Sequence, residues 1–234
     1  MTSTESVTAL IQAVGPDHVI TDENVRALYG KDIYYERCPP LAVVKPHSFD
    51  ELKTIVKTVA QENLTIAARG SGLSYTAGYL TDQDDTVLLD MQGLNEITEI
   101  NQDDMYVRVQ AGVTWNQLNE ALTPLGLRTP FWGTGSGLHA TVGGVLSQNA
   151  VNYGSGRYGM AAESVIGLRI ITADGEELLT GSWATPDSPS PFNRYYGPDL
   201  TGLFLGDSGA LGIKAEIALQ LIPRPAEVRF AAYS

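Results

Sequence analysis

"TIAARGSGLSYTAG", residues 65–78, and "GTGSGLHATVGGVLSQNAVNYGSGRYG", residues 133–159, are the stretches that decide the fold. Both are rich in glycine, and neither contains Asp or Glu, although the chain has 27 carboxylates and a formal net charge of −12. The carboxylate-free windows extend over residues 63–81 and 121–162. At the chain average the longer window would hold about five carboxylates, so their absence indicates a local site for an anion.

Glycine supplies the geometry that such a site needs. Without Cβ it adopts left-handed conformations and lets backbone amides converge on one point. "ATVGG" has the pattern of a helix start, with Thr141 as the cap and with Gly143 and Gly144 leaving room for a ligand at the first turn. One glycine-rich stretch alone is usually a plain turn, but two that both lack carboxylates favour a diphosphate site.

Two common phosphate motifs are excluded by their details. The chain has no GxxxxGK[ST] pattern, so it has no P-loop. Gly70 and Gly72 follow an expected strand, but Tyr75 stands where a dinucleotide fingerprint has its third glycine. No amphipathic helix follows either, which argues against a Rossmann site.

Composition limits the class of protein. The chain has 234 residues, of which 43% are hydrophobic and 18% charged, enough for one large domain or two small lobes. Its negative charge argues against nucleic acid and anionic membranes as partners. The single cysteine, Cys38, excludes an internal disulfide and a zinc cluster, and we expect no metal. The start of the chain lacks the pattern of a secretory signal and no apolar run could span a bilayer, so we expect a cytoplasmic protein without a transmembrane segment.

Helices and strands are mixed along the chain. Residues 48–62 predict a helix with Ser48 and Glu51 as a capping box. A second capped helix is predicted at 114–126, and the predicted strands are 64–68, 86–91 and 106–112.

The C-terminal half adds a predicted hairpin and a predicted half-buried strand. Residues 164–181 read as a hairpin with a two-residue turn at Asp174–Gly175, and residues 212–223 alternate strictly, as a half-buried strand does. Hairpins beside helices favour α+β over a doubly wound sheet. We expect a change of lobe in the polar stretch 93–105 and a surface insertion at 182–199.

Four motifs in order resemble a known family. They are "VVKPHSFDELKTIVKTVAQENLTIAARGSGLSYTAG", "HATVGGVLSQNAVNYGSGRYG", "VIGLRIITADGEELLTG" and "PDLTGLFLGDSGALGIKAEIALQLIPRP". Together they are similar to the FAD-binding domain of the vanillyl-alcohol oxidase (PCMH-type) flavoproteins, most of all to the glycolate and D-lactate dehydrogenase branch. The resemblance implies a two-lobed α+β fold with FAD between the lobes, here residues 1–95 and 96–234.

The resemblance also implies a set of cofactor contacts. The first loop would wrap the diphosphate, and the "ATVGG" helix start would supply a second set of amides. The strand "VIGLRII" would pack by the adenosine end, and the "GDSGALGI" turn would close over the cofactor. The residues implied to bind FAD are Pro46, Arg69, Gly70, Ser71, Gly72, Leu73, Ser74, Tyr75, Thr141, Gly143, Gly144, Ser147, Asn149, Ile166, Ile170, Gly209 and Ala210.

The sequence departs from the family in two respects. Many relatives tether the flavin through a histidine at the position of Leu73, and Cys38 lies outside the glycine motifs, so we expect non-covalent FAD. Relatives continue into a substrate or cap domain, whereas this sequence stops at Ser234. We therefore expect that the cap domain is absent and that a longer protein or a partner chain supplies it.

The expected function is that of an FAD-dependent oxidoreductase which oxidises a 2-hydroxy acid or an alcohol by hydride transfer to flavin. Two alternatives stay open: an NADPH-dependent reductase similar to UDP-N-acetylenolpyruvylglucosamine reductase, and a non-catalytic flavin-binding subunit. The motif "PDLTGLFLGDSGALGI" favours the dehydrogenase branch. The sequence names no catalytic residue, no particular substrate and no electron acceptor, whether O2, a quinone or a cytochrome.

Overall fold

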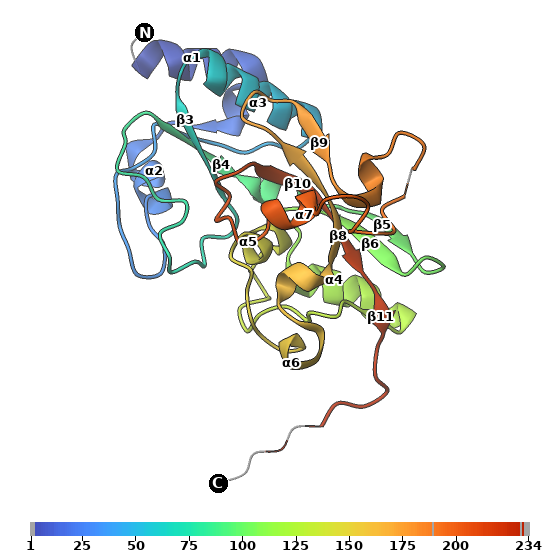
Figure 1. Ribbon diagram of the computed structural model, residues 1–234. Helices are drawn as coiled ribbons and strands as arrows, with labels where there is room; N and C mark the ends of the chain where they lie inside the picture. Colours follow the sequence, from blue (N-terminus) through green and yellow to red (C-terminus); the bar gives the residue numbers. More distant parts are fainter. Residues whose placement is uncertain (1–2, 189, 230, 232–234) are drawn as a thin grey trace.

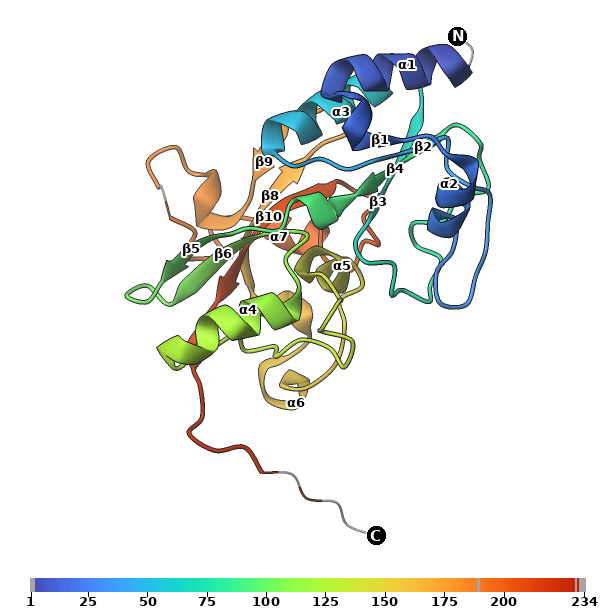
Figure 2. The same cartoon turned by 180° about the vertical axis from the view of Figure 1, so that it is seen from behind.

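The computed structural model describes residues 3–188, 190–229 and 231. Two larger sheets follow one another through the molecule, and a small third sheet has only two strands. Helices α1 (Ser3–Val14) and α3 (Phe49–Gln61) lie at one end, and α4 (Trp115–Leu122) and α6 (Ser155–Tyr158) lie at the other (Figure 1; Figure 2). A continuous apolar core includes side chains from both sheets, such as Leu89 and Val107. Within the described residues, no helix combines the length and the apolar character needed to cross a membrane.

The first sheet has the strand order β1-β2-β4-β3. Strands β2, β4 and β3 are parallel, and β1 is antiparallel to β2. Strand β4 is buried along its whole length, as is typical of a strand inside a parallel sheet. Helices α1 and α3 pack together, and the apolar face of α3 joins the core with Leu89, whereas Leu88 points the other way, toward Tyr79 and Tyr29 of α2. The bounds are α1 Ser3–Val14, β1 Val19–Ile20, α2 Glu23–Tyr29, β2 Ala42–Val44, α3 Phe49–Gln61, β3 Thr65–Arg69 and β4 Thr86–Asp90.

Helix α3 forms where the sequence predicts a helix. The Ser48 hydroxyl caps it by accepting a hydrogen bond from the Glu51 amide at 3.2 Å. The second bond of the predicted capping box is different, because the Glu51 carboxylate accepts from the His47 amide, at 2.8 Å, rather than from that of Ser48. The apolar positions at helical spacing are all buried: Leu52, Ile55, Val56 and Val59.

The second sheet is antiparallel throughout, in the order β5-β6-β10-β8-β9. Its first strand, β5, lies inside the polar stretch 93–105, for which the sequence predicted only a change of lobe. The first sheet uses residues 19–90 and the second residues 97–220, and a division into lobes at 95/96 stays a prediction. The bounds are β5 Ile97–Asn101, β6 Tyr106–Gln110, β8 Val165–Ile171, β9 Glu177–Leu179 and β10 Ile213–Gln220.

Strand β10 differs from the expected half-buried strand. All its residues except Gln220 are buried, because it is the central strand and has cover on both faces. On the outer face the Glu216 carboxylate is fully buried and pairs with Arg108 and Arg169, at 3.0 Å each. The strict alternation is also broken by a register shift between Lys214 and Glu216.

The hairpin of β8 and β9 has a longer connection than predicted. Ile171 pairs with Glu177, so five residues, 172–176, form the loop, and the predicted two-residue turn is wrong. Only Gly175 of the expected pair has a positive φ, of 77°. A side chain at Gly175 would collide with Lys57 of α3, so this glycine also permits close packing of the hairpin on that helix.

The segment 182–199 is only partly the surface insertion that the sequence predicted. Trp183 is buried, with its ring 4.7 Å from the Arg108 guanidinium and 5.4 Å from that of Arg169, so the start of the segment covers the outer face of the second sheet. The remaining elements are α4 Trp115–Leu122, β7 Leu127–Arg128, α5 Val142–Ser147, α6 Ser155–Tyr158, α7 Leu200–Leu203 and β11 Ile222–Pro223. Helix α4 begins with the predicted capping box of Thr114 and Gln117.

Candidate cofactor site

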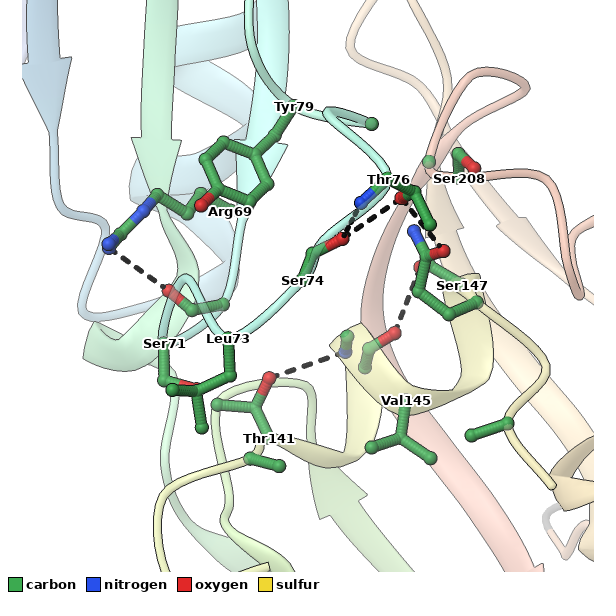
Figure 3. Close-up of a pocket in the computed structure, with 18 of the residues that line it drawn as sticks. Arg69, Ser71, Leu73, Ser74, Thr76, Tyr79, Thr141, Val145, Ser147 and Ser208 are labelled. Atoms are coloured by element: carbon green, nitrogen blue, oxygen red, sulfur yellow. Dashed lines mark hydrogen bonds between the residues drawn. The ribbon is translucent and has the colours of Figure 1, made fainter. Parts of the chain in front are cut away.

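A cavity of about 590 Å³ lies between three segments that are distant in the sequence. They are the glycine loop (residues 70–78) after β3, the helix α5, and the 206–212 turn that leads into β10 (Figure 3). The volume is in the range of small-molecule and cofactor sites. The two stretches that share the absence of carboxylates therefore meet at one cavity.

The glycine loop presents unpartnered backbone donors. It begins where β3 ends, and Gly72, with a φ of 76°, turns the chain. The amides of residues 71–75 donate to no partner in the part of the chain that the structure describes, and all five residues line the cavity. Unpartnered amides in such a loop are the donors with which proteins bind anions.

Arg69 fills the inside of this loop. Its guanidinium lies 4.7 Å from the ring of Tyr29 and 5.4 Å from that of Tyr79, and Nη1 donates to the Gly70 carbonyl at 3.4 Å (Figure 3). Burial raises the pKa of both tyrosines, which keeps both rings neutral. The Arg69 Nε is buried without a hydrogen-bond partner among the described residues. A buried cationic donor of this kind costs free energy until an acceptor arrives.

Residues 31–36, which we call the clasp segment, hold the glycine loop from outside. The Ala77 amide donates to Asp32 Oδ2 at 2.8 Å, and the Ile33 amide donates to the Ser74 carbonyl at 3.0 Å. Asp32 Oδ1 accepts two further amides, at 2.8 and 2.7 Å, from the residues after Ile33. Desolvation raises the pKa of Asp32, but the three backbone amides together outweigh it and hold that pKa below its ordinary value.

The start of α5 offers fewer donors than the sequence predicted. The Gly144 amide is capped by the Thr141 hydroxyl at 3.3 Å. The amides of Val142 and Gly143 donate to carbonyls of the segment after β6, at 2.8 and 2.9 Å. The expected second set of free amides is therefore wrong, because backbone and cap oxygens already accept them.

The two glycines of this helix have different surroundings. A side chain at Gly143 would press on the Cβ and backbone of Ala111, so close packing accounts for glycine there. At Gly144 the nearest neighbour of an added Cβ is the Thr141 hydroxyl, at 3.0 Å, and the residue lines the cavity. A side chain at Gly144 would take up space beside a ligand.

The third wall is the 206–212 turn. Ser208, at a left-handed φ of 54°, donates its amide to the Ser147 carbonyl at 2.9 Å and so ties the turn to the end of α5. Lys214 follows on β10 and lines the cavity, and its Nζ lies 2.6 Å from Asp207 Oδ1. The side chains of this ion pair are both almost completely buried.

A side-chain bond joins the glycine loop to α5 across the cavity edge. The Thr76 hydroxyl bonds to the Ser74 hydroxyl at 2.9 Å and donates to Gln148 Oε1 at 3.1 Å (Figure 3). Sequence reasoning missed several residues of the lining, although most lie within or next to the quoted motifs. They include Thr76, Tyr79, Gln148, Ser208 and Lys214.

The structure brings most of the sequence-predicted residues together. Those that line the cavity are Arg69, Gly70, Ser71, Gly72, Leu73, Ser74, Tyr75, Thr141, Gly143, Gly144, Ser147, Asn149 and Gly209. Pro46, Ile166, Ile170 and Ala210 are not part of the lining. Ile170 is buried directly behind Gly212 and backs the wall, while Pro46 is buried with its carbonyl against Gly93.

The charge of the cavity is opposite to that of the whole chain. Its described lining holds two charged residues, Arg69 and Lys214, and neither Asp nor Glu. It also holds no histidine and no cysteine. No group of three or more metal-ligating side chains occurs among the described residues. The lining suits an anionic ligand in a strongly acidic protein.

A family model described as FAD binding domain matches residues 40–181, more than half of the chain. This chain belongs to the FAD binding domain family. The expected resemblance is confirmed, and so is the expected fold class, α+β of the PCMH type. FAD is the cofactor that this family of domains binds.

Curated relatives of this FAD binding domain are similar over nearly the whole chain. The glycolate oxidase subunit GlcD of Bacillus subtilis is 31% identical over 92% of this chain and 44% of its own length. A probable mitochondrial D-lactate dehydrogenase of Danio rerio is 30% identical over 94% of this chain and 43% of its own. The chain thus spans less than half the length of these relatives.

Solved structures show the same fold at lower identity. A p-cresol methylhydroxylase structure with bound substrate superposes with a TM-score of 0.81 and 24% identity, over 96% of this chain and 44% of its own. An alkyldihydroxyacetonephosphate synthase structure gives a TM-score of 0.82 and 20% identity, over 97% and 42%.

The cavity fits FAD on its own geometry. FAD carries an anionic diphosphate with several acceptor oxygens, and the cavity offers the unpartnered amides of residues 71–75 and the orphaned Nε of Arg69. The described part of its lining contains no carboxylate that would repel the diphosphate. The unused hydrogen-bond donors of this FAD binding domain therefore match the acceptor oxygens of a diphosphate.

Proposed function

We propose that this chain forms the FAD-binding part of an oxidoreductase that oxidises a 2-hydroxy acid, with alcohols as the wider class. The observation that carries the proposal is the cavity. Among the residues that the structure describes, it joins five unpartnered loop amides and two cations and has no carboxylate in its lining. The 2-hydroxy acid is favoured because relatives over more than nine-tenths of the chain are a glycolate oxidase subunit and a D-lactate dehydrogenase. FAD supplies the redox chemistry by accepting two electrons from the carbon that bears the hydroxyl group.

The chain's own residues bind and orient the cofactor in this proposal. The amides of residues 71–75 and Arg69 hold the diphosphate, and Gly144 leaves room for it beside α5. The hydrogen bond from Thr76 to Gln148 fixes the position of the glycine loop relative to α5. Positioning of this kind, rather than proton transfer, is the contribution that the described residues make.

We further propose that FAD is held without a covalent bond. Leu73 occupies the position at which many relatives carry the tethering histidine, and no histidine or cysteine belongs to the described lining. Acid precipitation of the yellow protein should release all flavin into the supernatant. Flavin that stays with the pellet contradicts this part of the proposal.

One experiment separates the function from its rivals. The protein is purified, its visible spectrum is recorded, and the bound flavin is mixed without oxygen with glycolate, D-lactate, L-lactate or NADPH in a stopped-flow instrument. Bleaching by a 2-hydroxy acid supports the proposal. Bleaching by NADPH alone favours the reductase. Because an uncovered cavity slows the reaction, the mixtures are also followed for hours, and a flavin that no donor bleaches in that time favours a non-catalytic subunit.

We also propose that a longer protein or a partner chain covers the cavity. Tyr75 and Val151 line it and yet are 63% and 66% exposed, which leaves an apolar rim open to solvent. Without a cover that orients substrate, turnover by residues 1–234 should be far below the ordinary range of roughly 1–1000 per second. Steady-state assays with an artificial acceptor test this, and turnover within that range contradicts it.

The assignment of two lobes, residues 1–95 and 96–234, belongs to the same proposal, since the cavity lies between a loop of the first sheet and segments around the second.

We propose a cytoplasmic location as well, because the acidic chain is repelled by anionic membrane surfaces. Cell fractionation tests the location.

A further inference from the structure

A buried ion pair outside the glycine motifs forms part of the cavity wall. The side chains of Lys214 and Asp207 are each 3% exposed, and Lys214 Nζ lies 2.6 Å from Asp207 Oδ1. Lys214 is in the lining of the cavity and Asp207 is not. Lys214 therefore belongs to the cavity wall, and its ammonium is held by a carboxylate that lies outside the lining.

The bulge in β10 explains why a lysine of the central strand reaches the cavity. In the antiparallel register Lys214 is opposite Ile170, and Glu216 is opposite Arg169. Opposed residues share a face of the sheet, and neighbours such as Ile170 and Arg169 are on different faces. The register shift thus places Lys214 on the face of the core and the cavity, whereas Glu216 lies on the outer face.

Asp207 compensates the ammonium only in part. Its carboxylate also accepts the amides of Gly209, at 3.0 Å, and Leu211, at 3.3 Å. The ammonium can donate three hydrogen bonds, and within the described ranges its partner is Asp207 alone. Desolvation lowers the pKa of Lys214 even though the bond to Asp207 opposes this, so the buried charge lacks part of the compensation that it needs.

We propose that Lys214 is a cofactor-contacting residue: its ammonium, oriented by Asp207, donates a hydrogen bond to an acceptor atom of the FAD in the cavity. This inference rests on the proposed FAD site. Arg69 is the last residue of β3, directly before the glycine loop, and the turn before Lys214 carries Ser208 on the other side of the cavity (Figure 3). The two cations thus approach the cofactor from different walls, and the acceptor for Lys214 is distinct from that for Arg69.

A purely structural ion pair is the rival explanation, because Asp207 also fixes the 206–212 turn. Three variants separate the two: Lys214→Met, Asp207→Asn, and the double variant. Asparagine keeps the oxygen that accepts the Gly209 amide, and methionine keeps most of the lysine stem. FAD affinity is measured by quenching of flavin fluorescence, and the melting temperature is measured on the apoprotein.

Lys214→Met alone leaves the Asp207 carboxylate buried and unpaired, so its apoprotein should melt well below the parent. The double variant removes both charges and should recover most of that loss. If Lys214 contacts FAD, the double variant still binds FAD roughly 10- to 100-fold more weakly than the parent. Affinity that recovers together with the melting temperature overturns the proposal.

A matched control comes from an ion pair outside the lining. Arg194 Nη2 lies 2.8 Å from Asp199, and neither residue belongs to the cavity. Arg194→Met should lower the melting temperature and leave the affinity of the folded protein for FAD unchanged. A parent protein that binds no FAD would refute the proposed site itself, whereas a double variant with parental affinity refutes only the role of Lys214.

Discussion

At the scale of single residues, Gly143 and Gly144 show that adjacent glycines serve different physical purposes. The first lets α5 pack against Ala111, and the second leaves space beside the cavity. Gly144→Val should weaken FAD binding at least about tenfold, because branched carbons displace the ligand from the first turn. The apoprotein should melt near the parental temperature, since only the Thr141 hydroxyl must give way. Fluorescence titration and apoprotein melting measure both effects.

Gly143→Ala and Gly156→Ala are the comparisons for this prediction. An added Cβ at Gly143 meets Ala111 at 2.8 Å, so that variant should lose stability by roughly 1–3 kcal/mol. At Gly156 an added Cβ has no described heavy atom within 4 Å, and the residue lies outside the cavity lining, so Gly156→Ala should change neither quantity. Parental FAD affinity in Gly144→Val would contradict the placement of the cofactor beside α5.

At the scale of elements, the clasp segment determines how firmly the glycine loop is held. Asp32→Asn replaces one of the two carboxylate oxygens with an NH2 group, which cannot accept a hydrogen bond. Either the Ala77 amide or the two amides of the clasp segment then lose their acceptor, so the loop should loosen. We expect faster hydrogen exchange at the Ala77 amide and weaker FAD binding. Hydrogen exchange measured by NMR tests this. The control is Asp103→Asn, at an exposed aspartate between β5 and β6, in which the Ala77 amide should exchange at the parental rate.

The lowered pKa of Asp32 predicts how the stability difference between the parent and Asp32→Asn changes with pH. A carboxyl group whose folded pKa is below its unfolded value stabilises the fold fully above the unfolded value, about 3.9, and loses that contribution as the pH falls through the folded pKa. The difference in melting temperature between the parent and Asp32→Asn should therefore be constant near neutrality and shrink in acid. A difference that grows in acid would contradict the assignment.

The outer face of β10 depends on one buried carboxylate. Glu216 is fully buried and bonds to Arg108, Arg169 and the Thr98 hydroxyl, the last at 2.6 Å. Glu216→Gln removes the buried negative charge that pairs with both arginines and should lower the free energy of unfolding by about 3 kcal/mol. Glu176→Gln breaks an exposed pair with Lys57 and should cost at most about 1 kcal/mol in the same urea titration.

The sequence predicted those helices and strands that are determined by residues close together in the chain. Helix α3 and strands β3, β4 and β6 follow from apolar spacing, caps and flanking glycines, and the glycine loop follows from composition. The bulge in β10 was not predictable in this way, because alternation in one strand does not reveal a shift against its neighbour, and Lys214 was missed for that reason. The clasp segment was missed because Asp32 and Ala77 are 45 residues apart and meet only in the folded chain.

At the scale of the whole molecule, the two sheets share one apolar core. The pair Lys53–Glu177, at 3.1 Å, further joins α3 to the hairpin of the second sheet. We therefore expect a single cooperative unfolding transition, although the sequence predicts two lobes. The chain supplies its own probes: the one cysteine, exposed Cys38, lies in residues 1–95, and all three tryptophans lie in residues 96–234.

A fluorophore on Cys38 and tryptophan fluorescence should report the same urea midpoint and the same slope. A thiol label attached to Cys38 does not disturb the core, since the side chain is exposed. Midpoints that differ beyond error would show lobes that unfold separately, and would contradict the shared core.

The contrast between an acidic exterior and a cationic cavity also governs how fast the cofactor arrives. At a distance the formal charge of −12 repels the FAD dianion, and only within the cavity do Arg69 and Lys214 attract it. Salt screens the distant repulsion over a Debye length of about 10 Å at 0.1 M but screens the buried contacts much less. Added salt should therefore speed association of FAD with the apoprotein and leave dissociation nearly unchanged, the reverse of the behaviour of most charge-steered ligands. Stopped-flow quenching of flavin fluorescence at increasing ionic strength measures both rates, and an association rate that falls with salt would mean that incoming FAD is attracted from outside the cavity.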